Sequence, residues 1–447
     1  MNTPICDFVR QYAEEKNLRL HMPGHKGKGP LGLEILDITE IDGADVLYHC
    51  DGIIKESQDN AAKLFGSAKT VYSAEGSSLA IRAMLYLAVL HAKERGKLPR
   101  IAAGRNAHKT FMTAAALLDL EVQWLYPENR ESILSCHITA EELEKHLSTE
   151  GEKTTAVYIT SPDYLGNRAD LQTLSAVCHE HGALLLVDNA HGAYLNFLPQ
   201  SLHPMALGAD LCCDSAHKTL PVLTGGAYLH IGKGAPDLLS QQAERAMALF
   251  ASTSPSYLIL QSLDAANPYL AEDYREKLAA FASKVSDLKK RLKSQGFALV
   301  GEEALKLSLA PKSYGYRGTE LADCLRGKGI VCEFSDPDYL VLMLTPEIGE
   351  DGLAQIEAAL SELPKKEAVS EMPPLLPIPQ KELSLRTALF SPSAELEISR
   401  CEGKILADAN VACPPAIPIL VSGEVIDPAA IDCLSYYGIS HCRVVSQ

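Results

Sequence analysis

Near the middle of this chain, two ionisable residues lie at or shortly after the ends of short apolar runs that are typical of buried strands. Asp188 ends the apolar run ALLLVD at 183–188, and Lys218 comes shortly after the apolar stretch 209–214. Because ligands of open α/β sheets bind at the carboxyl ends of the strands, a carboxylate and a lysine at these places could face one pocket. Each residue alone has an equally good ordinary explanation, since Asp188 could cap a helix and Lys218 could be a surface lysine on a turn.

A lysine and an acid in one pocket are the pair that pyridoxal 5′-phosphate (PLP) requires. The lysine forms an imine with the cofactor aldehyde, and the carboxylate keeps the pyridine nitrogen protonated so that the ring can accept electrons from the substrate's α-carbon. The segment EGSSL, 75–79, puts hydroxyls and free backbone N–H groups at the start of an expected helix, which favours phosphate binding. Simple helix capping explains such a start more often.

A histidine offers a further contact with a flat cofactor. His108 lies in RNAHKT, 105–110, which follows an expected strand and opens an expected helix, so that its ring could stack on the cofactor. A lone histidine at this place is ordinarily a capping or surface residue.

The elements that must position these residues alternate along the chain. Between Lys55 and Leu260, short apolar runs alternate with longer helical patterns, which is typical of βαβ units around a mostly parallel sheet. The sequence therefore predicts an α/β fold, with Gly96 and Gly182 at helix C-caps. The clearest expected strands are 100–103, 155–160, 183–187, 209–214 and 226–231, and the clearest helices are 78–93 and 171–181.

Beyond Pro268 the pattern changes. A charged helical stretch, 271–293, leads into apolar segments at 305–310 and 340–344 around a helix at 320–328, which indicates a second, smaller α/β domain. The proline-rich passage that follows reads as a linker. The predicted organisation is an N-terminal arm (1–50), a large cofactor-binding domain (51–267), a small α/β domain (268–362), a linker (363–380) and a C-terminal α+β domain (381–447).

The composition and the net charge indicate which kinds of binding partner to expect. The 447 residues are 47% hydrophobic and 22% charged, as in an ordinary globular enzyme, and the net charge of −16 argues against nucleic acid or an anionic membrane as partner. A signal-peptide core and a long apolar run are both missing, so we expect a cytoplasmic protein with a small-molecule substrate. The 12 cysteines form no CxxC pair, which predicts reduced thiols and no metal site.

Together these segments resemble the Orn/Lys/Arg decarboxylase family of fold-type I PLP enzymes over nearly the whole chain. The tail at 404–425 resembles the family's C-terminal domain, and the length is similar to the short Gram-positive type without an N-terminal wing domain. The matching motifs, in order, are HMPGHKGK (21–28), DITEIDGAD (37–45), IKESQDNAAKLFG (54–66), GSS (76–78), RNAHK (105–109), SPDYLG (161–166), DNAHG (188–192), SAHKTLP (215–221) and TSPSY (253–257).

The resemblance implies an aspartate-aminotransferase-like large domain and a role for each matched residue. Lys218 would carry the cofactor, Asp188 would pair with its ring nitrogen, His108 would stack on the ring, and His191 would help to position the acid or the cofactor. Ser252 would reach the phosphate of a neighbouring subunit, so a homodimer with shared active sites is implied. The residues implied at the phosphate or beside it are Gly76, Ser77, Ser78, Ser215 and His217, the last of which also counts among the catalytic residues.

Three places depart from the family pattern. Glu75 stands where Asn is common, Asn189 stands where Glu is usual, and Gly225–Gly226 replaces a larger pair. These differences bear on substrate preference more than on the chemistry at Lys218.

The reaction implied by the resemblance is α-decarboxylation of arginine, lysine or ornithine to an amine of polyamine pathways. Glu333, in VCEFSD, is the implied contact for the distal cation, and a solvated acid at a strand end is an equally good explanation. An aminotransferase or another PLP enzyme on the same fold is the first alternative, with Arg317 as the arginine that would hold the α-carboxylate. A non-catalytic binding subunit is the second, and the joint presence of Lys218, Asp188 and His108 argues against it.

Overall fold

The computed structural model describes residues 1–127, 130, 132–150, 153–408 and 415–446. The described chain divides into two compact units. Unit 1 contains residues 1–99, 143–158 and 170–277, and unit 2 contains residues 100–142, 159–169 and 278–447. This division does not follow the domain boundaries expected from the sequence, which stay a prediction.

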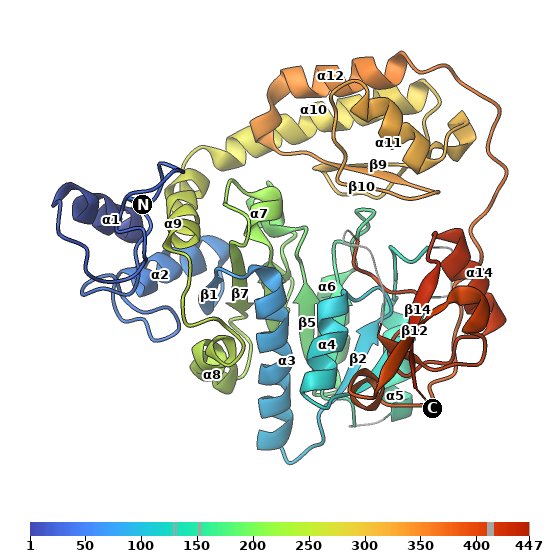
Figure 1. The fold of residues 1–447 in the computed structure, drawn as a ribbon, viewed down its shortest axis with the longest axis horizontal. Helices are drawn as coiled ribbons and strands as arrows, with labels where there is room; N and C mark the ends of the chain where they lie inside the picture. Colours follow the sequence, from blue (N-terminus) through green and yellow to red (C-terminus); the bar gives the residue numbers. More distant parts are fainter. Residues whose placement is uncertain (128–129, 131, 151–152, 409–414, 447) are drawn as a thin grey trace. The chain divides into compact units, whose positions relative to one another are not determined.

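Unit 1 is built on helices and strands that alternate along the chain (Figure 1). Strands β5 and β6 pair in parallel, whereas β7 runs antiparallel to both β6 and β1. The elements of unit 1 are α1 (Pro4–Glu14), α2 (Ile53–Phe65), β1 (Lys69–Ser73), α3 (Gly76–Glu94), α6 (Leu171–Glu180), β5 (Leu184–Asp188), β6 (Leu211–Asp214), α7 (Ala216–Thr219), β7 (Ala227–Ile231), α8 (Asp237–Ala248) and α9 (Tyr257–Ala271).

Unit 2 holds two further sheets of its own. The elements of unit 2 are β2 (Arg100–Gly104), α4 (Lys109–Leu117), β3 (Glu121–Leu125), β8 (Leu299–Val300), β9 (Lys306–Leu309), α11 (Gly318–Arg326), β10 (Phe334–Ser335), β11 (Leu340–Met343), α12 (Gly349–Ser361), α13 (Leu385–Leu389), β12 (Ser393–Glu397), β13 (Leu406–Asp408), α14 (Pro428–Tyr436) and β14 (His441–Val445). Three elements have residues in both units: α5 (Ala140–Glu150), β4 (Ala156–Thr160) and α10 (Tyr274–Ser294).

The described residues form a large sheet with the strand order β1-β7-β6-β5-β4-β2-β3. Every residue of β5 and β7 is buried, which explains why these strands read as continuous apolar runs instead of alternating ones. The five strands expected in this region are confirmed to within two residues at each end, and so is the α/β class. Strands β1 and β3 were not predicted, because KTVYS and EVQWL mix polar and apolar residues over only five positions.

Glycines end the two predicted helices as expected. Gly96 and Gly182 have φ values of +68° and +65°, the left-handed region that closes a helix and that residues with a Cβ rarely adopt. At its other end α6 is capped by Asp170, whose side chain accepts the N–H of Thr173.

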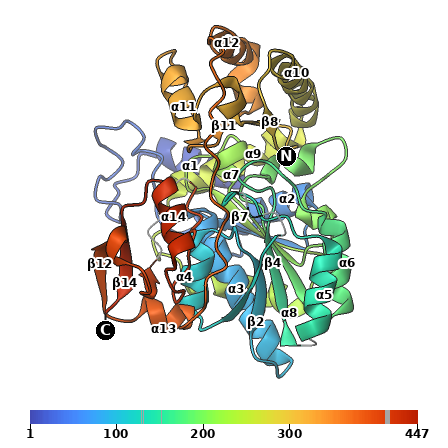
Figure 2. The same ribbon diagram turned by 90° about the vertical axis from the view of Figure 1, so that its right-hand side faces the viewer.

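The small sheet of unit 2 has the order β10-β11-β9-β8 and is antiparallel. Helices α10, α11 and α12 cover one of its faces (Figures 1 and 2). This confirms the predicted alternation of strands and helices beyond Pro268. The passage 363–380, expected to be a linker, forms no helix or strand among these described residues.

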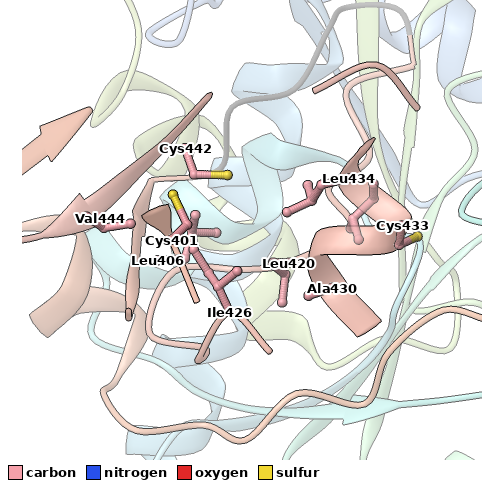
Figure 3. Packing of buried hydrophobic residues seen from close by; sticks show 10 residues of the cluster. Cys401, Leu406, Leu420, Ile426, Ala430, Cys433, Leu434, Cys442 and Val444 are labelled. Carbon is pink, nitrogen blue, oxygen red and sulfur yellow. The ribbon is translucent and has the colours of Figure 1, made fainter. Parts of the chain in front are cut away.

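The end of the chain forms a separate apolar core. Strands β12, β14 and β13 make an antiparallel sheet, and α14 packs its buried residues with those of the sheet. Figure 3 shows Leu420 and Ile426 directed into the same core as Leu406 and Cys442. Residues 409–414 of the tail motif lie outside the described residues.

Candidate functional site

Asp188 lies at the carboxyl end of β5, as predicted, and is 3% exposed. The Tyr158 hydroxyl donates to its Oδ2 at 3.0 Å, and the N–H of Ala190 donates to its Oδ1 at 3.2 Å. The Cys213 thiol lies 3.5 Å from Oδ1. These contacts hold the Asp188 carboxylate in one orientation, so that it is ready to accept a further hydrogen bond.

Lys218 lies in the short helix α7, which begins two residues after β6 ends. Its Nζ is 2.9 Å from Nε2 of His191. His191 belongs to the turn that follows β5, so the parallel pairing of β5 with β6 brings together the two turns that carry the predicted residues. An imidazole nitrogen at this distance can orient the lysine amine and share a proton with it.

The predicted phosphate turn meets the turn after β6. The Ser215 hydroxyl donates to Ser77 Oγ at 2.7 Å, which places two of the expected phosphate ligands side by side. Helix α3 begins at Gly76, and Ser78 lies in its first turn. The N-terminus of α3 carries a partial positive charge, so these hydroxyls lie where an anion is favoured.

Glycines let the backbone close around this turn. Gly76 has a φ of +71°, and its N–H donates to the carbonyl of Gly225 at 2.7 Å. Gly225 has a φ of +99°, and a Cβ there would come within 3.0 Å of the Ala74 carbonyl oxygen. Gly225 is therefore required by the close approach of this backbone to the predicted phosphate turn.

Glu75 points its carboxylate at the backbone of a distant loop. Its Oε1 accepts the N–H of Ser252 at 2.7 Å, while Ser252 Oγ accepts the N–H of Ser254 at 3.1 Å. The negative charge of Glu75 is thus used in holding the Ser252 loop. The Ser252 hydroxyl keeps its hydrogen as a donor.

His217, the neighbour of Lys218, is anchored to the start of β7. Its Nδ1 lies 3.0 Å from the carbonyl oxygen of Gly226, which also accepts the His217 backbone N–H at 3.2 Å. Since a carbonyl can only accept, Nδ1 carries the hydrogen.

Two predicted site residues belong to unit 2. His108 is the N-cap of α4, where its Nδ1 accepts the N–H of Thr110 at 3.1 Å, so the capping interpretation is confirmed. Its stacking role stays a prediction. Glu333 precedes β10, and the Tyr164 hydroxyl donates to its Oε1 at 2.7 Å.

A buried cluster behind the site was missed by the sequence analysis. Oδ2 of Asp214, the last residue of β6, lies 2.9 Å from His203 Nε2 and 3.2 Å from His230 Nε2, and all three side chains are fully buried. The Asn189 amide donates to Asp214 Oδ1 at 2.6 Å. An ionised glutamate at position 189 could not donate to Asp214, so this hydrogen bond depends on the asparagine. No local signal marks His203 or His230, because three different parts of the chain supply the cluster.

Hydrogen bonding accounts for this cluster without an ion. Although burial alone would raise it, His203 and His230 hold the pKa of Asp214 well below its ordinary value. Burial lowers the pKa of His230. The ligand atoms lie within 4.8 Å of one another, a spacing that a metal could use, but His203 Nδ1 accepts the Met205 N–H at 3.3 Å and His230 Nδ1 lies 2.8 Å from Thr70 Oγ1. The cluster therefore acts as a network in which both histidines donate to Asp214.

The donor set of unit 1 fits PLP. The buried carboxylate ends β5, the lysine amine follows the neighbouring parallel strand β6, and serine hydroxyls lie at a helix N-terminus. Amine, acid and phosphate ligands are the three contacts that this cofactor needs. The fold and the site define an α/β enzyme of the aspartate-aminotransferase type.

Comparisons with known proteins narrow this class. Residues 3–310 match the Orn/Lys/Arg decarboxylase family, major domain. The chain is 29% identical to an arginine decarboxylase of Bacillus subtilis (strain 168), over 95% of this chain and 91% of that protein. An arginine decarboxylase of Halalkalibacterium halodurans is also 29% identical, with the same coverage of 95% and 91%. The chain therefore belongs to the Orn/Lys/Arg decarboxylase family, which confirms the predicted resemblance.

Solved structures confirm the predicted fold. The lysine decarboxylase of Francisella novicida superposes with a TM-score of 0.80 at 16% identity, covering 99% of this chain and 81% of that one. Among the described residues, none of the helices is long and apolar enough to span a membrane.

Proposed function

We propose that this chain is a PLP-dependent decarboxylase of a basic amino acid, namely arginine, lysine or ornithine. The observation that carries the proposal is the contact between Lys218 and His191 beside Asp188, in the turns after two parallel strands. Membership of the Orn/Lys/Arg decarboxylase family supports the reaction, and the relatives named arginine decarboxylase support a basic substrate.

Each residue then has a definite task. PLP, when bound, supplies an electron-poor ring that accepts the electron pair left at the α-carbon when CO₂ departs. Lys218 would hold the cofactor through its Nζ and give way to the substrate amine, and Asp188 would hold a proton at the ring nitrogen. Lys218 or a neighbouring histidine, His191 or His217, returns a proton to the α-carbon.

The phosphate is assigned to the N-terminus of α3. Ser77 and Ser215 lie together there, and Ser78 and Gly76 belong to the same turn. Ser252 is assigned to the phosphate of a neighbouring subunit, which makes the active form a homodimer. The cytoplasmic location and the absence of nucleic-acid and membrane partners stay predictions.

Glu333 is the proposed contact for the distal cation of the substrate. Its carboxylate is oriented by the Tyr164 hydroxyl, and Tyr164 in turn packs against Phe334. An acid whose direction is fixed in this way loses less side-chain entropy on binding a cation than an acid that is free to rotate.

Transamination is the weaker alternative. Arg317, the arginine expected to hold an α-carboxylate in that reaction, donates through Nη2 to Glu371 Oε2 at 2.6 Å. An arginine already paired with a carboxylate would have to exchange that partner before it could bind a substrate.

A substrate panel tests the proposal. We expect purified protein with PLP to release CO₂ from at least one of arginine, lysine and ornithine, and Lys218→Ala to lower that rate by more than about a hundredfold. Lys233→Ala, which removes an exposed lysine, is the matched control. Conversion of PLP to its amino form without CO₂ release would favour the aminotransferase instead, and no reaction with any of the three amino acids would reject the decarboxylase.

A further inference from the structure

The ring of His108 is tied to the first turn of α4. Its Nδ1 accepts the N–H of Thr110 at 3.1 Å and lies 3.0 Å from Thr110 Oγ1. A ring held by the backbone of a helix follows any displacement of that helix. The groups that hold α4 in place therefore determine the orientation of the His108 ring.

Residues from the C-terminal part of the chain hold the start of α4. The N–H of Lys109, the first residue of the helix, donates to the carbonyl of Ala416 at 2.8 Å. Just before the helix, Arg105 donates through Nη2 to the carbonyl of Ile419 at 2.8 Å and to Glu424 Oε2 at 3.0 Å, and its Nη1 donates to the carbonyl of Pro418 at 3.3 Å.

Arg105 and Glu424 form a buried ion pair. Their side chains are 8% and 3% exposed, and Glu424 Oε2 also accepts the N–H of Val421 at 2.7 Å. Breaking such a pair leaves a charge without compensation in a medium that solvates it poorly. The pair thus resists separation of the segment 416–424 from the turn that carries His108.

A second arginine from the same part of the chain holds the other end of α4. Arg386, in α13, donates through Nη1 to the carbonyls of Ala116 and Leu117 at 3.1 and 3.0 Å. These are the last two residues of α4, where carbonyls lack helical partners and a cation is favoured by the helix dipole. Both ends of α4 are therefore bound by side chains or carbonyls from residues 386–424.

The apolar core of the C-terminal segment makes this support rigid. Leu420 and Ile426, which flank Glu424, are 2% and 0% exposed and point into the core with Leu406 (Figure 3). A segment anchored on both sides of Glu424 can transmit its position to Arg105.

We propose that the C-terminal segment is a clamp on α4 and that Arg105, Glu424 and Arg386 are positioning residues for His108. The inference rests on the proposed function together with the predicted stacking of His108 on the cofactor ring. Through this clamp, a region that supplies none of the proposed cofactor ligands controls how tightly PLP is held.

A double-mutant cycle with His108 tests the clamp. Arg386 is exposed, so Arg386→Gln keeps the core intact; we expect a rise of about two- to fivefold in the PLP dissociation constant. Glu424→Gln should raise it by about tenfold. Glu424→Gln should speed amide hydrogen exchange in the first turn of α4 and Arg386→Gln should speed it in the last turn, and Arg386→Lys should restore the wild-type values. In a His108→Ala background neither variant should change PLP binding further.

The control is Arg443→Gln, which removes an exposed arginine that pairs with Glu395 at 4.0 Å. It should leave both measurements unchanged. Equal effects of Arg386→Gln in the wild-type and His108→Ala backgrounds, or unchanged exchange in α4, would overturn the clamp. If wild-type protein binds no PLP and releases no CO₂, the proposed function fails as well; if it does both and the cycle shows no coupling, only the clamp fails.

Discussion

His191 contacts Lys218 across two turns, and this contact links two predicted site residues directly. The distance of 2.9 Å from Nζ to Nε2 is that of a hydrogen bond that can involve a charge. In the proposed function, His191 would therefore share a proton with Lys218 in addition to helping to position the acid or the cofactor.

We expect His191→Phe to lower kcat by about tenfold or more, because a hydrogen bond to a charged group is worth about 1.5–3 kcal/mol. The pH profile of kcat should shift, since the lysine would lose its proton-sharing partner. Steady-state CO₂ release from pH 5 to 9 measures both. His441→Phe, at an exposed histidine, is the control, and a wild-type profile for His191→Phe would contradict this role.

At the scale of elements, Asp214 joins β6 to β7 and to the turn after β5. It accepts hydrogen bonds from His203, His230 and Asn189, and Asn189 follows Asp188 directly. Asp214 therefore supports Asp188 indirectly, because it binds the side chain of the next residue along the chain, Asn189.

We expect Asp214→Asn to lower the free energy of unfolding by about 2–3 kcal/mol at pH 7, since the buried donors would lose a charged acceptor. The folded pKa of Asp214 lies below its unfolded value of about 3.9, so its stabilisation is present above that pH and is lost as the pH falls. Urea unfolding at pH 5, 4, 3 and 2 should show a difference between the two proteins that is constant above about pH 4 and shrinks below it. A difference independent of pH would contradict the charged state assigned to Asp214.

Asp336, in the turn between β10 and β11, shows the opposite behaviour. Burial raises the pKa of Asp336 to about 7, against the opposing effect of two backbone N–H donors. Its Oδ1 accepts the N–H groups of Asp338 and Tyr339 at 2.7 and 2.6 Å. The nearby Lys312 donates a hydrogen bond to the Asp338 carboxylate instead. A charge there is unfavourable, while an amide oxygen could accept the same bonds.

We expect Asp336→Asn to stabilise the protein by about 1–3 kcal/mol at pH 8. Because the folded pKa is raised, the wild type loses stability as the pH rises from about 4 to about 7, and the advantage of the variant should grow over that window and then level off. Thermal unfolding at pH 5, 6, 7 and 8 measures it. Destabilisation at pH 8 would show that the turn needs the ionised carboxylate.

In the proposed dimer, the Ser252 loop would bring the Ser252 hydroxyl to the phosphate bound by the neighbouring subunit. Glu75 holds that loop through the Ser252 N–H, while the hydroxyl hydrogen stays able to donate. Glu75, which lies beside the predicted phosphate turn, thus helps to position Ser252 for the proposed contact.

We expect sedimentation to give twice the mass of the chain, and Ser252→Ala to raise the PLP dissociation constant by about tenfold, since one hydrogen bond to a phosphate is lost. Ser254→Ala removes a neighbouring hydroxyl and should have little effect. A monomer that binds PLP as tightly as any other species would contradict the shared site.

The positions of Lys218, Asp188 and the Ser77 turn could be predicted from the sequence, because a buried parallel strand is a short apolar run whose end is visible locally. The sequence also determined the family, since many short motifs occur in the right order. The folded chain was needed to find that His191 contacts Lys218, that Glu75 accepts the N–H of Ser252, and that Asp214 accepts hydrogen bonds from two histidines. Such contacts depend on strand order and on which turns meet, and no local pattern encodes which distant side chain fills a given space.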